Sequence, residues 1–153
     1  MAPLIPPGRA FMSDRVFVDT NILVYARDSA DPIKQAGASE ALARLWRERS
    51  GRISTQVLSE YFVTVTQKLR PGLDREAAWS DVEALSAWDP VAIDQGTLRK
   101  AREVQIRHGL SWWDSLIVAA AWVAECAEIL SEDLGAGETY LGLRVINPFQ
   151  SKA

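Results

Sequence analysis

Short apolar segments alternate with longer helical patterns along most of this chain. Five segments have the length and composition of strands, at residues 15–18, 52–54, 91–93, 128–131 and 144–146. Helical spacing or capping signals mark the stretches between them, at 32–49, 56–69, 95–107 and 111–124, with a further helix after Asp74. Alternation of this kind predicts an α/β fold, with a central, mostly parallel sheet of four to five strands and helices on both faces.

Length and composition indicate one domain with an ordinary core. The chain has 153 residues, of which 48% are hydrophobic and 24% charged. Residues 1–12 are rich in proline and lack the apolar region of a secretory signal, so we expect a flexible N-terminal extension before a domain at 13–150. The net charge of −3 does not by itself indicate a nucleic-acid-binding protein, although local basic stripes do most such binding.

Cysteine and histidine are scarce, which excludes two kinds of structural cross-link. Cys126 is the single cysteine, so no internal disulfide can form, and with one histidine the chain lacks the ligands of a structural zinc site. A reduced, cytoplasmic compartment is therefore expected. No apolar run approaches the ~20 residues of a transmembrane helix, so no membrane association is expected.

Four acidic residues lie where a predicted strand ends or in a predicted helix. Asp19 closes the first strand, Asp133 follows the fourth, and Asp114 and Glu60 belong to helices. In a parallel α/β sheet these positions converge on the carboxyl edge, where ligands bind. Four carboxylates brought together repel one another unless a cation neutralises them. The pattern therefore predicts a Mg²⁺ or Mn²⁺ site.

Each of these residues also has a purely structural interpretation. Asp19 is suited to a turn or a helix cap, although the adjacent Thr20 and Asn21 can orient a carboxylate or hold a metal-bound water. Asp114 is the third residue after Ser111, which matches a capping box.

For two acidic positions the neighbouring residues alone do not indicate a functional role. Glu60, on a helix, is typical of a solvent-exposed face, and only the whole set of carboxylates argues otherwise. Asp133 lies beside Glu132, and charge alone does not separate the two. Because side chains alternate along a strand, these neighbours are expected to point to opposite sides.

Four stretches together resemble the PIN-domain ribonucleases, and among these the VapC toxins of bacterial toxin–antitoxin pairs. The stretches are 18–25 (VDTNILVY), 59–60 (SE), 111–121 (SWWDSLIVAAA) and 130–134 (LSEDL). The family's four acidic positions fall on Asp19, Glu60, Asp114 and Asp133. The resemblance places Thr20, Asn21, Ser111 and Ser115 as supporting residues, with Ser115 in place of the usual alanine.

The resemblance implies a metal-dependent endonuclease acting on single-stranded or loop RNA. It implies one or two Mg²⁺ or Mn²⁺ ions held by Asp19, Asp114 and Asp133, with Glu60 holding a second ion or acting as general base. It also implies a small antitoxin partner and a homodimer. Apolar residues that can supply these contact surfaces, as well as core, are Leu42, Leu45, Trp46, Phe62 and Val65.

An RNA substrate needs basic residues near the acidic site. The candidates are Arg27, Arg99, Lys100, Arg102 and Arg107. Trp112 is a candidate for stacking on an unpaired base, while at least one of Trp112 and Trp113 is expected in the core.

Other protein classes fit the sequence less well. A phosphoacceptor receiver domain needs paired acids after the first strand, and a phosphatase with an aspartate nucleophile needs a second aspartate where Asn21 stands. A housekeeping RNA-processing PIN nuclease and a non-catalytic RNA- or protein-binding module of the same fold remain open alternatives.

Overall fold

The computed structural model describes residues 13–150 and contains one five-stranded sheet, so the predicted extension at 1–12 lies outside the described residues. Its strand order is β2-β1-β3-β5-β4, and every neighbouring pair is parallel except β4 and β5. The α/β prediction is confirmed. The strands are β1 (Val16–Val18), β2 (Gly51–Arg52), β3 (Glu128–Leu130), β4 (Thr139–Tyr140) and β5 (Leu143–Ile146).

Helices flank this sheet, and most begin at a side chain that caps the first turn. They are α1 (Thr20–Tyr25), α2 (Pro32–Glu48), α3 (Thr55–Val63), α4 (Arg75–Leu85), α5 (Gln95–His108) and α6 (Trp112–Val123). A π-helical turn, η2 (Thr64–Lys68), extends α3, and a 3₁₀ turn, η3 (Ser86–Trp88), follows α4. Within residues 13–150, no helix combines the length and apolar character needed to cross a membrane.

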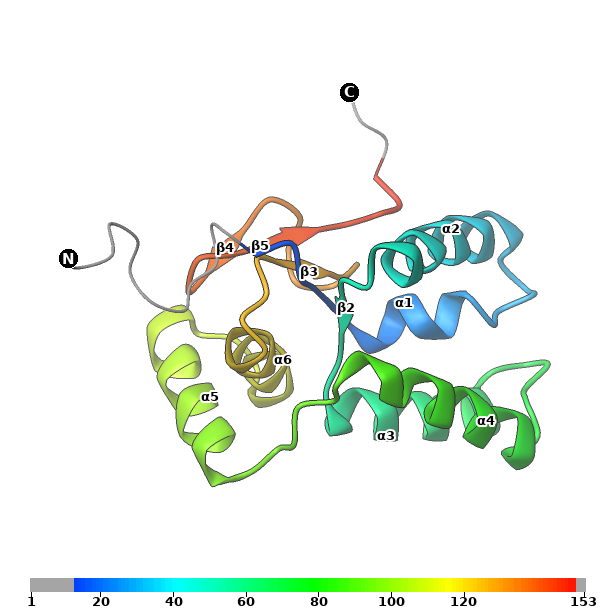
Figure 1. Ribbon diagram of the computed structural model, residues 1–153, viewed down its shortest axis with the longest axis horizontal. Coiled ribbons are helices and arrows are strands. Elements are labelled where there is room, and N and C mark those ends of the chain that lie inside the picture. The colour runs from blue at the N-terminus through cyan, green and yellow to red at the C-terminus, as the bar shows by residue number, and fades with distance from the viewer. Residues whose placement is uncertain (1–12, 151–153) are drawn as a thin grey trace.

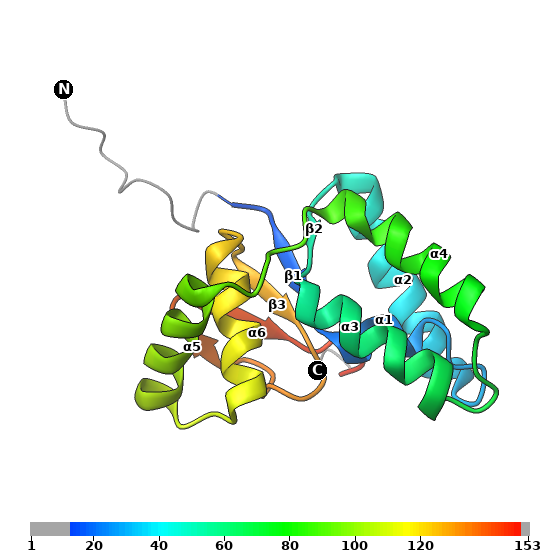
Figure 2. The same cartoon turned by 90° about the horizontal axis from the view of Figure 1, so that it is seen from below.

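Two groups of helices surround the sheet. Figures 1 and 2 show α5 beside α6, which packs against β3 and β5, while α1 to α4 gather at the β2 edge. The connection that leaves β1 leads to β2, whereas the connection that leaves β3 leads to the hairpin of β4 and β5, on the opposite side. Connections that diverge in this way open a crevice at the carboxyl ends of β1 and β3, which is where α/β proteins bind ligands.

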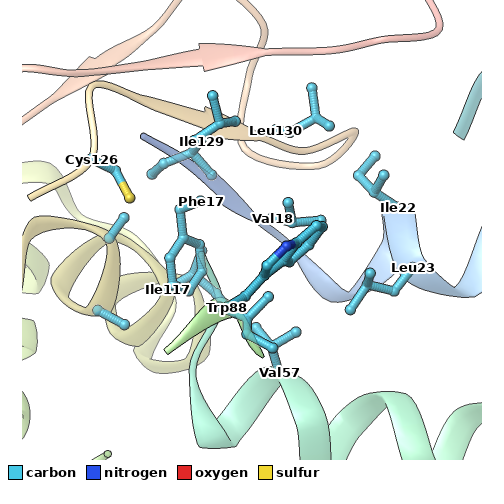
Figure 3. Packing of buried hydrophobic residues seen from close by; sticks show 14 of the residues in the cluster. Phe17, Val18, Ile22, Leu23, Val57, Trp88, Ile117, Cys126, Ile129 and Leu130 are labelled. Carbon is cyan, nitrogen blue, oxygen red and sulfur yellow. The ribbon is translucent and has the colours of Figure 1, made fainter. Parts of the chain in front are cut away.

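The core joins the sheet to both helix groups. Phe17 and Ile129 of neighbouring strands and Val57 of α3 are fully buried, and Ile117 of α6 is nearly so (Figure 3). Trp88 lies in the same cluster, only 2% exposed. Burial of these apolar side chains thus fastens the short strands to the helices around them.

The sequence-based prediction differs from the structure at two strands. The predicted strand at 91–93 is wrong, because only a single bridge joins Val91 to Ser54. The hairpin that contains β4 was not predicted. Its two-residue turn is Leu141-Gly142, both at positive φ, and a leucine in that position hides the usual Asn-Gly signal of such a turn.

Candidate active site

Asp19 is the most constrained acidic residue of the molecule. It follows β1 and caps α1, where one carboxylate oxygen accepts the Thr20 N–H at 2.7 Å. The other oxygen accepts the Ser131 hydroxyl at 2.7 Å and the Asn21 amide at 3.4 Å. Only 7% of Asp19 is exposed. Asp19 thus both ends the strand and caps the helix, and its hydrogen bonds hold the carboxylate in one orientation.

Burial makes the Asp19 carboxylate costly to ionise. The pKa of Asp19 is raised from 3.8 to about 6, mainly by desolvation, with smaller contributions in the same direction from the nearby charges of Asp133 and Glu60. The hydrogen bonds from Ser131 and Thr20 act in the opposite direction. Near neutral pH the group is still mostly ionised, but at a free-energy cost that a neighbouring cation would relieve.

Asp133 and Glu132 occupy different environments. Asp133 accepts the Asn21 amide at 2.9 Å, and its own N–H donates to Ser131 Oγ at 3.1 Å. Glu132 instead accepts from Lys34 at 2.5 Å and from the Tyr25 hydroxyl at 2.8 Å. The Lys34 contact lowers the pKa of Glu132, with a further contribution from Tyr25. Asp133 is therefore the acidic residue of this pair that faces the crevice, while Glu132 belongs to an ion pair beside it.

Glu60 reaches the crevice from α3. One carboxylate oxygen accepts the Thr20 hydroxyl at 3.2 Å, and the other accepts the Gln56 amide at 2.7 Å. Glu60 is solvent-exposed, as its helical position suggests, yet it points toward the residues that follow β1. Thr20 thus links Glu60 to the segment that carries Asp19.

Asp114 stands in the first turn of α6, at the predicted cap. Ser111 Oγ accepts the Asp114 N–H at 3.1 Å, and the Ser115 hydroxyl donates to the Ser111 carbonyl at 2.8 Å. These bonds position the helix start, and the helix N-terminus favours a negative charge there.

All four predicted acidic residues line one open pocket of about 370 Å³. They come from the end of β1, from α3, from α6 and from the loop after β3. Within residues 13–150, no three potential ligands already stand close enough to form a metal-binding cluster. An open, acidic pocket still fits Mg²⁺, because this ion takes one or two carboxylates and keeps several waters.

The residues predicted to contact RNA are not brought together with this pocket. Arg27 forms a two-pronged ion pair with Asp81, at 2.9 and 2.5 Å, and Arg99 and Arg102 are exposed on α5. None of these three lines the pocket.

Of the two adjacent tryptophans, Trp113 lies at the pocket and Trp112, the predicted stacking residue, packs in the core. Trp112 packs against a small core cluster of Ala101, Leu116 and Ala119. Trp113 is 63% exposed and lines the acidic pocket. Trp113 is therefore the tryptophan available at this site, where Tyr25 also lines the pocket.

Some residues considered for partner surfaces are core residues. Leu45 and Val65 are fully buried, whereas Trp46 is 40% exposed and Leu42 and Phe62 are half-buried. Trp46 and Leu42 line a second, mainly apolar pocket of about 480 Å³ between α1, α2 and α4.

Two further residues belong to the site, although the sequence did not single them out. Ser131 holds Asp19 and Asp133 together, and Gln56 joins Glu60 to the Trp113 carbonyl at 3.4 Å. The available signals were weak: a serine directly after a strand, and a glutamine one helical turn before Glu60.

Comparison with known proteins places these observations in a family context. A PIN-domain family model matches residues 16–140. A protein from a Klebsiella pneumoniae toxin–antitoxin complex superposes with a TM-score of 0.65 at 19% identity, covering 89% of this chain and 99% of that one. The sequence has no significant match among curated proteins.

Two further solved structures are similar. The Mycobacterium tuberculosis toxin VapC20, described as cleaving the sarcin–ricin loop, has a TM-score of 0.57 at 17% identity, covering 77% and 89% of the two chains. VapBC2 from Rickettsia felis, bound to promoter DNA, has a TM-score of 0.56 at 20% identity, covering 85% and 96%. At these identities the structural likeness establishes the shared fold.

Proposed function

Since the chain belongs to the PIN-domain family, we propose that it is a metal-dependent endoribonuclease that cleaves single-stranded or loop RNA. One observation carries the proposal. Four carboxylates from four separate parts of the chain line the same open pocket, at the carboxyl edge of the sheet. A pocket with this charge serves a reaction on phosphodiesters only with a cation present, because the substrate is itself an anion.

Magnesium or manganese, as one or two ions, fits the oxygen ligands of this pocket. Asp19, Asp114 and Asp133 are the residues that would hold it, directly or through water. A bound divalent ion neutralises charge on the transferring phosphoryl group and lowers the pKa of coordinated water.

The protein's own residues have distinct parts in this proposal. Ser131 and the Thr20 N–H fix the direction of the Asp19 carboxylate, and Asn21 holds Asp133 at the same edge. Glu60 is exposed enough to take a proton from an attacking water, or to hold a second ion.

The toxin subtype is a further part of the proposal. A toxin would act in the cytoplasm, form a homodimer and be held inactive by a small antitoxin. Its support is the fold shared with toxin–antitoxin proteins and the apolar pocket beside Trp46, which suits a peptide with an apolar face. A housekeeping RNA-processing nuclease and a non-catalytic binding module are the alternatives.

The decisive experiment measures cleavage of labelled RNA with Mg²⁺ or Mn²⁺, with EDTA, and by Asp19→Asn. Asp74→Asn is the matched control, because Asp74 also caps a helix through its carboxylate but lies outside the pocket. We expect cleavage by the wild type and by Asp74→Asn, and its loss with EDTA or Asp19→Asn. Cleavage that survives Asp19→Asn would refute the site, and well-folded protein that binds RNA without cutting it would favour the binding module.

The neighbouring acids allow a second matched comparison. Asp133→Asn removes a carboxylate that lines the pocket, whereas Glu132→Gln removes the neighbouring carboxylate outside it. We expect a larger loss of kcat/KM in the first variant. The opposite order would assign the fourth acidic position to Glu132.

The toxin assignment is tested separately by growth arrest. Expression of the protein alone should stop growth in an Asp19-dependent manner, and co-expression of a short reading frame from the adjoining gene should restore it. Normal growth with active nuclease would favour the housekeeping alternative.

A further inference from the structure

A groove of about 780 Å³ adjoins the acidic pocket and shares a wall with it. The shared wall consists of Gln56, Glu60, Thr64 and Trp113, which line both cavities. We call this groove the Trp113 groove. Its remaining lining includes Val63, Ile93, Leu116 and Lys68. The groove is thus mainly apolar, in contrast to the pocket beside it.

Trp113 lines this groove with an exposed side chain and is not part of the core. Its side chain is 63% exposed, whereas Trp112 packs on α5 and Trp88 is 2% exposed in the main core. Val63, on the same groove, is 40% exposed. Leaving a large indole in water forgoes burial energy, so this position is better explained by a ligand than by stability.

The position of Trp113 is tied to the acidic residues. Trp113 directly precedes Asp114 in the first turn of α6, and the Gln56 amide donates both to Glu60 and to the Trp113 carbonyl. These contacts hold the backbone at Trp113 in a constant relation to the carboxylates. A ring carried by this backbone can set where a substrate strand lies relative to the reacting phosphate.

The charges along the groove differ between its two ends, with Glu60 at the acidic pocket and Lys68 farther along. Lys68 is the one basic residue lining either cavity within residues 13–150, and it stands eight residues after Glu60 on α3 and η2. Helical rise places it roughly 12 Å along the axis from Glu60. An anionic strand that leaves the acidic pocket along this groove meets an apolar surface first and a cation afterwards.

We propose that the Trp113 groove is a base subsite, in which one unpaired nucleobase next to the scissile phosphate stacks on Trp113 while the following backbone phosphate lies near Lys68. The proposal rests on the proposed RNA-cleaving function and gives it a substrate requirement. RNA must present an unpaired, extruded nucleotide beside the cut. Base–aromatic stacking is tolerant of sequence, so this requirement concerns base pairing more than base identity.

The test combines protein variants with RNA that lacks a single base. Trp113→Ala and Trp113→Phe are compared with Trp79→Ala, which removes another exposed tryptophan, 53% exposed on α4 and outside both cavities. Binding of single-stranded RNA is measured by fluorescence anisotropy in EDTA, and KM and kcat are measured with Mg²⁺. Each protein is tested with intact RNA and with RNA abasic at successive positions beside the cut.

Loss of the stack should weaken RNA binding and raise KM by about 5- to 150-fold in Trp113→Ala. Trp113→Phe should recover much of this loss, and Trp79→Ala should behave as the wild type. Removing the base at one position should weaken RNA binding by the wild type by a similar factor. The same abasic RNA should bind Trp113→Ala almost as well as intact RNA does, because the base and the ring act as a pair.

The outcomes separate this inference from the nuclease proposal. Trp113-dependent binding without cleavage would support the subsite and refute the nuclease. Cleavage and binding that are unchanged in Trp113→Ala would refute the subsite alone, and protein that neither binds nor cuts RNA would refute both. A change of oligomeric state in Trp113→Ala, with unchanged RNA affinity, would identify the groove as a contact between copies of the chain and overturn the inference.

Discussion

Replacing Asp19 by asparagine should make the metal-free protein more stable while abolishing its activity. The substitution keeps the shape of the side chain but removes a buried negative charge. Desolvation and the charges of Asp133 and Glu60 oppose that charge in the folded protein. Without a cation, the native state therefore bears a cost that the unfolded chain does not.

The size of this cost follows from the pKa of Asp19. Folding raises the pKa from 3.8 to about 6, and a shift of this size corresponds to about 3 kcal/mol above the folded-state pKa. An amide has only one acceptor oxygen, so the hydrogen bond from Ser131 or Thr20 must rearrange, at about 1 kcal/mol. A net gain of about 2 kcal/mol is expected, or roughly 4–8 °C in Tm for a domain of this size.

The gain should depend on pH in a defined direction. The folded state binds the proton more tightly than the unfolded chain, so wild-type stability falls as pH rises from 3.8 to about 6 and the loss is complete above that range. The difference between Asp19→Asn and wild type should therefore be small near pH 4.5 and full at pH 7.5. Urea unfolding in EDTA at pH 4.5, 6 and 7.5 measures it.

Added Mg²⁺ supplies an internal control. Binding to the native state should stabilise the wild type more than Asp19→Asn and narrow the gap between them. The difference in stability between the control Asp74→Asn and the wild type should not depend on pH or Mg²⁺ in this way, because Asp74 is exposed. The reasoning is refuted if Asp19→Asn is less stable than the wild type in EDTA at pH 7.5, or if the difference does not change with pH.

Three further substitutions or reactions test other parts of the structure. Ser131→Ala removes a hydrogen bond that lowers the pKa of Asp19, so the acidic limb of the pH–kcat/KM profile should move upward and kcat/KM should fall about 10- to 100-fold; an unmoved limb would contradict this. Burial raises the pKa of Cys126 to about 12, so a thiol reagent at pH 8 should label only unfolded protein, and rapid labelling of native protein would disagree. Gly51→Ala places a Cβ 2.5 Å from the Trp88 ring, which should cost about 1–3 kcal/mol in urea unfolding; unchanged stability would show that the ring moves freely.

Local signals determined much of the fold and part of the candidate site. A three-residue apolar run followed by Asp19 indicates both a strand end and a helix cap, because each depends only on neighbouring residues. The same holds for Asp114, whose N–H is capped by Ser111 three residues earlier. Such interactions form within one helical turn, so their residue pattern is visible in the chain itself.

The short β4 strand shows where local signals fail. Its hairpin turn has Leu141 at positive φ, which a leucine adopts only when surrounding contacts hold it there. At 91–93 the local signal is present, but the predicted strand does not form. Its residues are apolar, but within residues 13–150 one bridge to Ser54 is the only strand pairing that Val91 makes.

Tertiary structure alone decided which of two similar neighbours faces the pocket. Glu132 is drawn away by Lys34, 98 residues distant in sequence, which leaves Asp133 beside Asn21. Trp112 packs against α5, whereas Trp113 stays exposed. Adjacent residues with similar side chains, such as two acids or two tryptophans, have similar local propensities. Only contacts between distant segments, through charge pairing and burial, distinguish them.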